Sequence, residues 1–134
     1  MEPYIIAIDQ STSATKVLLV DRQGRIIRWA SHAHRQYYPR PDWVEQDAME
    51  IFDNTGRGIF DVVQGMNPSD IAAEAITNQT GAFVLWDQAT GEPVYPVVGW
   101  QCGRGQPVVD RMTPEELEIF RRSAGSSPSA FLPA

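Results

Sequence analysis

Cysteine is nearly missing from this sequence, because its 134 residues include only one, Cys102. A single thiol cannot form a disulfide within the chain, so a disulfide-stabilised secreted scaffold is excluded and we expect a reducing, cytoplasmic location. Long apolar runs are missing too, and none reaches the roughly 20 residues that a membrane-spanning helix needs. Glu2 and Asp9 lie close around a short apolar stretch, which does not fit a signal peptide.

Positive charge is scarce. The chain has 11 Lys and Arg against 17 Asp and Glu, a net charge of -6, and a pI near 4.8. This balance argues against a nucleic acid or an anionic membrane as the main partner. The remaining composition, 43% hydrophobic and 21% charged, is ordinary for a soluble globular chain, and the length predicts one modest domain.

Three short apolar segments open the chain. Residues 5–8 form a continuous apolar run, and residues 17–21 and 26–30 follow it after short turns. Such close succession predicts an antiparallel meander of three strands. Residues 32–43 are polar and aromatic with two prolines, which predicts a loop. His32 and His34 lie in it, and with no third ligand nearby we expect a solvated surface pair in preference to a metal site.

A helix is predicted after residue 47. Asp47 and Glu50 have the spacing of a capping box, and Asn67-Pro68 marks the end of the helix. Gly56 and Gly58 are each expected, if exposed, to weaken it locally by about 1 kcal/mol relative to alanine. The apolar residues that recur at close to helical period are Phe52, Ile59, Val62, Val63 and Met66.

The second half of the chain predicts further strands and one more helix. Residues 71–77 are expected to form a strand parallel to the first, and residues 83–86 and 94–95 a hairpin. Thr113, Pro114 and Glu116 predict a helix start, and Gly125 its end. Strand-strand-strand-helix-strand is typical of a ribonuclease-H-like, actin-like ATPase lobe. We therefore predict an α/β fold with a mixed sheet, as a partial lobe.

The first predicted turn concentrates polar chemistry. Asp9 ends an apolar run, a hydroxyl-rich turn follows, and Lys16 precedes the next run. A carboxylate can hold Mg²⁺, and hydroxyls, turn amides and a lysine can bind phosphate oxygens. On this local pattern alone an ordinary turn is the more common explanation. An aspartyl-phosphate enzyme is disfavoured, because that chemistry needs a second acid where Ser11 stands.

Four ordered motifs carry a resemblance to a known family. They are YIIAIDQSTSATKVLLVD, YPRPDWVEQDAMEI, AITNQTGAFVLWDQATGEPVYPVVGWQCGR and the tail with Ala124-Gly125. Together they resemble the N-terminal lobe of the FGGY carbohydrate kinases, and glycerol kinases most closely. The similarity covers essentially the whole chain.

The resemblance implies ATP and Mg²⁺ as cofactors and a small sugar or polyol as substrate. By position, Asp9 matches the acidic residue beside the metal and the phosphates. The turn that approaches the ATP phosphates corresponds to Ser11, Thr12 and Ser13, with Lys16 at a position that is basic in glycerol kinases. On the substrate side the implied residues are Gln79, Thr80, Gly81, Trp100, which matches a tryptophan packed on the polyol, and Phe131, which replaces a tyrosine.

Departures from the family pattern affect the predicted substrate. Thr80-Gly81 replaces an Arg-Glu pair that binds the hydroxyls of glycerol, so glycerol is not expected as the substrate. A larger or differently decorated sugar or polyol fits better. Ser11 also replaces a glycine, Ala14 a hydroxyl residue and Gly103 an arginine.

The resemblance places the general base later in the lobe and the adenine pocket mainly in a second lobe. Neither lies in residues 1–134, so we assign no catalytic residue and expect this first part of the lobe to have little or no kinase activity by itself. The alternative is a non-catalytic, truncated or degenerate paralogue that binds a ligand or a partner protein. An exposed apolar surface would then favour self-association.

Overall fold

The computed structural model describes residues 3–131, which form two compact units. The first unit contains residues 3–35 and 47–79, and the second contains residues 36–46 and 80–131. Each unit has its own small hydrophobic cluster.

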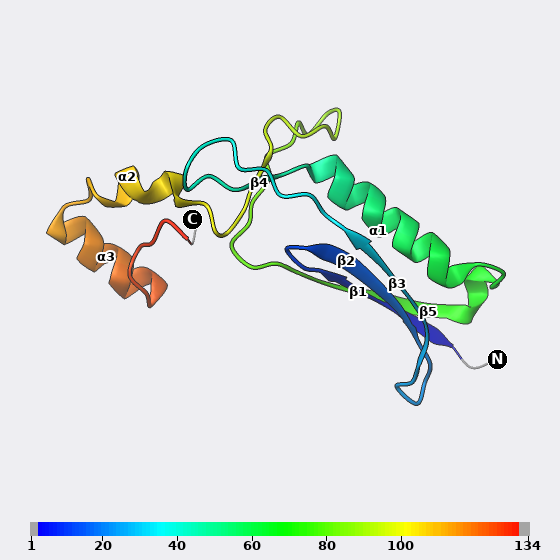
Figure 1. Cartoon of the computed structure of the whole chain (residues 1–134). Helices are drawn as coiled ribbons and strands as arrows, with labels where there is room; N and C mark the ends of the chain where they lie inside the picture. Colours follow the sequence, from blue (N-terminus) through cyan, green and yellow to red (C-terminus); the bar gives the residue numbers. More distant parts are fainter. Residues whose placement is uncertain (1–2, 132–134) are drawn as a thin grey trace. The chain divides into compact units, whose positions relative to one another are not determined.

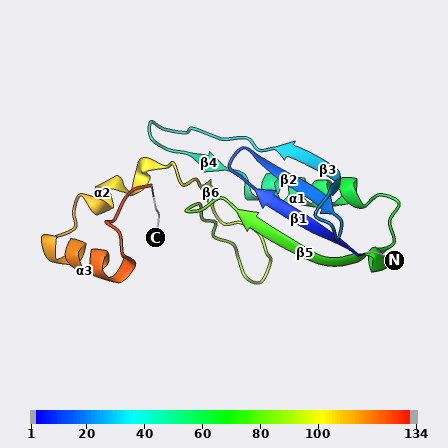
Figure 2. The ribbon, with the colours of Figure 1, turned by 90° about the horizontal axis from the view of Figure 1, so that it is seen from below.

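The first unit is built on a four-stranded mixed sheet. Strands β1 (Tyr4–Gln10), β2 (Ala14–Val20) and β3 (Ile26–Ala33) form an antiparallel meander, and β5 (Ile71–Asn78) lies parallel to β1. The sheet order is β3-β2-β1-β5, with β5 on the outer edge (Figure 2). The predicted meander and parallel strand are confirmed. However, β3 continues through Ala33, so the predicted loop begins later and His32 lies in a strand.

Helix α1 (Ala48–Val63) packs against one face of this sheet (Figure 1). Strands alternate their side chains between two faces, so every second residue of β1 and β2 points at the helix. The buried core between them consists of Ile6, Ile8, Val17, Leu19 and Val62. This packing stabilises the central strands and leaves the opposite face of the sheet without a helix from the described part of the first unit.

The face of α1 that contacts the sheet agrees with most of the predicted apolar residues. Val62 is buried in the core, and Ile59 and Val63 pack against it. Phe52 is exposed, whereas Asn54 and Gly58 are buried on this face. Gly58 has a packing role in addition to its low helix propensity. A Cβ there would lie 2.5 Å from Cγ2 of Val17, so only glycine lets the helix approach β2 this closely.

The ends of α1 also need correction. Asp47 caps the helix as predicted, accepting from the amides of Met49 and Glu50, but Glu50 accepts the amide of Arg35 at 3.1 Å. The helix ends at Val63, before the predicted Asn67-Pro68. Asn67 instead caps a short 3-10 turn, η1 (Pro68–Asp70), that leads into β5.

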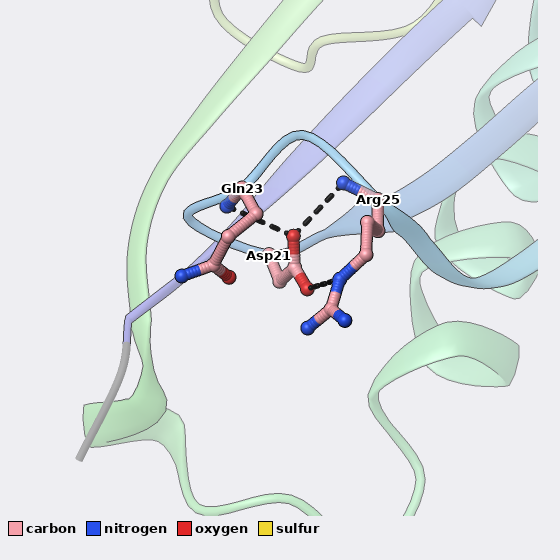
Figure 3. Close-up of polar contacts among 3 residues, drawn as sticks. All are labelled: Asp21, Gln23 and Arg25. Atoms are coloured by element: carbon pink, nitrogen blue, oxygen red, sulfur yellow. Dashed lines mark hydrogen bonds and ion pairs between the residues drawn. The ribbon is translucent and has the colours of Figure 1, made fainter.

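The turn between β2 and β3 is organised by one carboxylate (Figure 3). Asp21 accepts hydrogen bonds from the amides of Gln23 and Arg25 at 3.0 and 2.8 Å, and from Nε of Arg25 at 2.7 Å. Burial by itself would raise the pKa of Asp21, but these bonds and the guanidinium charge lower it below its usual value. The charged carboxylate thus fixes the entry into β3.

The second unit has little regular sheet. Strands β4 (Glu45–Gln46) and β6 (Val97–Val98) pair antiparallel, followed by η2 (Gly103–Gly105), α2 (Gln106–Val109) and α3 (Pro114–Ala124). The predicted start and end of α3 are confirmed, with the Thr113–Glu116 capping box and left-handed Gly125.

The predicted hairpin of residues 83–95 is only partly correct. Its turn forms, because the amide of Val94 donates to the carbonyl of Leu85 and Asp87 accepts from the amides of Ala89 and Thr90. Its arms are not strands, since Phe83 and Trp86 make isolated bridges only. Among the helices of residues 3–131, none is long and apolar enough to cross a membrane.

Candidate functional site

The hydroxyl-rich segment forms the tight turn between β1 and β2. The amide and hydroxyl of Ser11 both donate to the carbonyl of Ala14, at 3.0 and 2.9 Å. Thr12 and Ser13 occupy the tip without a positive φ, so the turn accommodates Ser11 in place of glycine without backbone strain. Ser13 is exposed, while Ser11 and Thr12 are half-buried. A compact turn with its hydroxyls at the tip suits an anion such as phosphate.

The register of the sheet brings Asp9 and Lys16 opposite each other. Asp9 pairs with Lys16 across the hairpin and with Thr77 across the parallel pair with β5. Directly opposite residues point to the same face, so a carboxylate, an ammonium and a hydroxyl share the face away from α1. Asp9 is half-buried and Lys16 is exposed. The predicted site residues Asp9, Ser11, Thr12, Ser13 and Lys16 therefore lie together at one end of the first unit.

A magnesium ion fits this arrangement only with phosphate present. No cluster of three or more His, Cys, Asp or Glu able to hold a metal occurs within residues 3–131. Mg²⁺ is commonly held by one or two carboxylates, water and substrate phosphates, without a protein cage. Asp9 can supply that single carboxylate, so the donor set fits a nucleotide-bound ion and does not fit a resident metal.

The two histidines differ from their prediction as a solvated pair. His32 is half-buried and its Nε2 lies 2.8 Å from Oδ2 of Asp61 on α1. His34 is buried beneath the β1–β2 turn. The sequence gave no signal that both rings would bond to residues of α1.

The predicted substrate residues do not form one cluster in either unit. Gln79 belongs to the first unit, where its amide donates to the carbonyl of Gln10 at 2.8 Å. Thr80, Gly81, Trp100 and Phe131 belong to the second unit, and Gly81 has a φ of 83°. Trp100 and Phe131 are exposed.

Sequence reasoning missed a polar cluster of the second unit, which is centred on Arg104. Its guanidinium donates to Glu45 at 2.6 Å, to Sγ of Cys102 at 2.9 Å and to the hydroxyl of Tyr95 at 3.2 Å, and it stacks 3.9 Å from the ring centroid of Trp43. Burial would raise the pKa of Cys102, but hydrogen bonds and the charge of Arg104 lower it. Arg104 and Glu45 lie far apart in the sequence, so no local sequence pattern indicates that they pair.

An apolar cavity of about 580 Å³ lies beside this cluster, within the second unit. Its lining is mainly apolar, with Arg104 and Ser129 among its few polar side chains, and Arg104 is already engaged. A polyol needs several hydrogen-bond partners. The cavity is therefore a poor match for a polyol. The other lining residues are Phe83, Val98, Cys102, Gly105, Val108, Met112, Phe120, Pro128 and Ala130.

Comparison with known proteins decides the family. A model of the N-terminal domain of the FGGY family of carbohydrate kinases matches residues 4–130. The chain belongs to the FGGY family. The predicted membership, the resemblance to glycerol kinases and the predicted α/β fold with a mixed sheet are confirmed.

Several glycerol kinases are similar to this FGGY chain. Glycerol kinase 1 of Thermotoga maritima is 44% identical over 117 residues, which cover 86% of this chain and 24% of that protein. The glycerol kinase of Leifsonia xyli subsp. xyli is 43% identical over 128 residues, covering 93% of this chain and 25% of that protein. The FGGY chain thus spans about a quarter of the length of these relatives.

Solved structures of sugar kinases share the fold. Plasmodium falciparum glycerol kinase with ADP has a TM-score of 0.85 at 25% identity, covering 99% of this chain and 27% of that one. Gluconate kinase from Lactobacillus acidophilus has a TM-score of 0.81 at 24% identity, covering 91% and 25%, which shows a common fold.

Proposed function

We propose that this chain is the first part of an ATP-dependent sugar or polyol kinase, and that its β1–β2 turn binds the nucleotide phosphates. The observation that carries the proposal is the register that sets Asp9 opposite Lys16 at the end of the hairpin. Membership of the FGGY family supports it.

The roles of the turn residues follow from their chemistry. Thr12 and Ser13 offer hydroxyls and amides to phosphate oxygens, and the Lys16 ammonium offsets the negative charge of the phosphates. Ser11 contributes by closing the turn, because its amide and hydroxyl both donate to the carbonyl of Ala14. Asp9 holds Mg²⁺, directly or through water. When bound, Mg²⁺ neutralises charge on the phosphate oxygens during transfer. The chain's residues thus bind and orient the phosphates of ATP.

The substrate of the whole kinase is proposed to be a sugar or polyol other than glycerol. Gln79, Thr80, Gly81, Trp100 and Phe131 are its proposed contacts. Thr80-Gly81 offers no charged donor or acceptor, and the left-handed φ of Gly81 disfavours a side chain at that position. An apolar ring such as Trp100 suits the carbon face of a sugar.

This chain by itself is proposed to lack kinase activity, because phosphoryl transfer requires substrate, metal and nucleotide to be positioned together with a base. The alternative function is non-catalytic binding of a ligand or a partner protein. The Thr80-Gly81 replacement and the exposed apolar residues of the sheet favour that alternative.

Calorimetric titration of the chain with ATP, with and without Mg²⁺, tests the phosphate site. We expect Asp9→Asn to weaken binding of Mg-ATP about tenfold or more, as loss of a charge-assisted contact predicts, while binding of metal-free ATP does not weaken. Asp53→Asn, an exposed carboxylate on α1, is the matched control. Equal affinities of the wild type and Asp9→Asn for Mg-ATP would exclude the proposed role of Asp9.

A phosphorylation assay separates the two functions. The chain alone should phosphorylate none of a panel of pentoses, hexitols and tetritols. A longer protein containing this sequence should phosphorylate at least one of them, and should prefer it to glycerol. Failure of the longer protein on the entire panel would favour the non-catalytic alternative.

A further inference from the structure

A buried polar cluster lies beneath the β1–β2 turn and has no role in the proposed chemistry. It joins Thr15 of β2, Asn54 of α1 and His34, which follows β3. Their exposed fractions are 0%, 5% and 8%. Burying three polar side chains is costly unless they satisfy one another, so the donor and acceptor of each bond matter.

The hydrogen bonds define the proton position on His34. The side-chain nitrogen of Asn54 lies 2.9 Å from the carbonyl of Ala33, so this atom is a donor and is correctly assigned as nitrogen. The same nitrogen lies 3.2 Å from Nδ1 of His34, which must therefore accept. The ring proton is then on Nε2, and it donates to Oγ1 of Thr15 at 3.0 Å. The geometry requires a neutral imidazole.

The cluster holds the turn from both sides. The backbone amide of His34 donates to the carbonyl of Ser13 at 2.8 Å, while its ring holds Thr15 just after the turn. On the other limb, Nε2 of Gln10 donates to Oγ1 of Thr55 at 2.8 Å. Two adjacent residues of helix α1, Asn54 and Thr55, therefore connect the helix to the turn end of the β1–β2 hairpin.

We propose that His34 is a positioning residue for the phosphate-binding turn, and that it acts only as the neutral imidazole. The inference rests on the proposed function of the turn. Protonation of Nδ1 would set an N–H against the amide nitrogen of Asn54 and break the link between α1 and β2. Phosphate binding should then weaken in mild acid.

The groups around His34 determine the pH range in which its ring becomes protonated. Burial lowers the pKa of His34 below its ordinary value of 6.5, and the charge of Glu50 on α1 opposes this in part. Thr15 and Asn54 are uncharged, Lys16 points to the other face of the sheet, and His32 pairs with Asp61. Because the unfolded chain binds this proton more readily, the stabilising contribution of the neutral cluster is complete above pH 6.5 and is lost as the pH falls through the lowered pKa of His34.

The test is the affinity for Mg-ATP between about pH 5 and pH 8 for the wild type and His34→Gln, with calorimetry as the readout. Glutamine retains a donor toward Thr15 but does not titrate in this range. We expect the wild type to lose about three- to tenfold in affinity toward acid beyond any change in His34→Gln, as loss of one or two hydrogen bonds predicts. Titration of ATP itself affects both proteins equally.

His32→Gln is the matched control, since it removes a histidine that lies opposite Thr15 in the sheet but bonds through its ring to Asp61 of α1. It should keep the wild-type pH profile. If the wild type and His34→Gln bind with the same profile, the positioning role is overturned and the phosphate site stands.

If the wild type binds no Mg-ATP at any pH, the proposed function fails. Hydrogen exchange of the Ser11–Ala14 amides then tests separately whether His34 orders the turn. A loss of protection of these amides in acid, relative to the intrinsic exchange rate at each pH, in the wild type but not in His34→Gln supports ordering of the turn by His34. Identical exchange in the two proteins overturns it.

Discussion

At the scale of single residues, Gly58 shows how packing reverses an expectation based on helix propensity. Glycine is a poor helix former, so two glycines within α1 suggest a weak helix. In the structure Gly58 is buried against Val17, whereas Gly56 is exposed and a Cβ added to it would meet no atom within 4 Å. The two glycines thus have different physical roles in the same helix.

Substituting the two glycines separates these roles. Gly58→Ala should lower the free energy of unfolding by about 1–3 kcal/mol, because its Cβ would meet Val17 at 2.5 Å. Gly56→Ala should raise it by up to about 1 kcal/mol through helix propensity alone. Urea denaturation followed by circular dichroism measures both. A stabilising Gly58→Ala would show that α1 can move away from β2 without loss.

The residues of the candidate site were predictable to different degrees. Asp9, Ser11, Thr12, Ser13 and Lys16 are close in sequence, so a single hairpin brings them together. His34, Asn54 and Thr15 come from three elements, and their contact depends on how α1 crosses the sheet. Hydrophobic periodicity carries no information about such a buried polar contact.

At the scale of elements, local sequence patterns correctly predicted the elements whose formation depends mainly on neighbouring residues. The capped start of α3 and the β1–β2–β3 meander depend on nearby residues, and both are confirmed. Residues 83–95 have apolar runs typical of strands, but their arms make isolated bridges only. Strand formation there requires partners along the whole segment, which sequence spacing cannot establish.

The segments around β4 and β6 are joined by Arg104. Its ion pair with Glu45 is shielded, with side-chain exposures of 17% and 13%, whereas those of the Arg121–Glu118 pair on α3 are 63% and 49%. A shielded pair that loses one partner leaves an uncompensated charge. An exposed pair contributes little.

Arg104→Met should therefore lower the stability of the second unit by about 2 kcal/mol or more. Arg121→Met, the matched control, should change it by less than about 1 kcal/mol. Urea denaturation followed by tryptophan fluorescence measures the stability of both variants. Equal free energies of unfolding in the two variants would contradict a structural role for Arg104.

At the scale of the whole molecule, the sheet face opposite α1 carries exposed apolar side chains among the described residues of the first unit. Ile5, Leu18 and Trp29 share this face by register, and Ile5 and Trp29 are exposed. Apolar residues gathered on an exposed sheet face favour association. Family membership was predictable from ordered motifs, but this exposure is visible only once α1 is placed.

Self-association of the chain should depend on Trp29. Sedimentation velocity at increasing concentration should show oligomers for the wild type and fewer for Trp29→Lys, because a charge on this face opposes its burial. Trp86→Lys, which replaces a similarly exposed tryptophan in the second unit, should behave as the wild type. A wild type that stays monomeric at high concentration would contradict the expectation.

The parallel pairing of β1 with β5 has a consequence for how the chain folds as it is synthesised. β1, β2 and β3 can pair as soon as they emerge, whereas Tyr4 must wait for Ile71 before β1 gains its second neighbour. Closing so long a loop is slow compared with forming adjacent hairpins. We therefore expect α1 to pack on the newly synthesised meander first and β5 to pair with β1 last. Until β5 pairs, the edge of β1 stays open to other chains during synthesis.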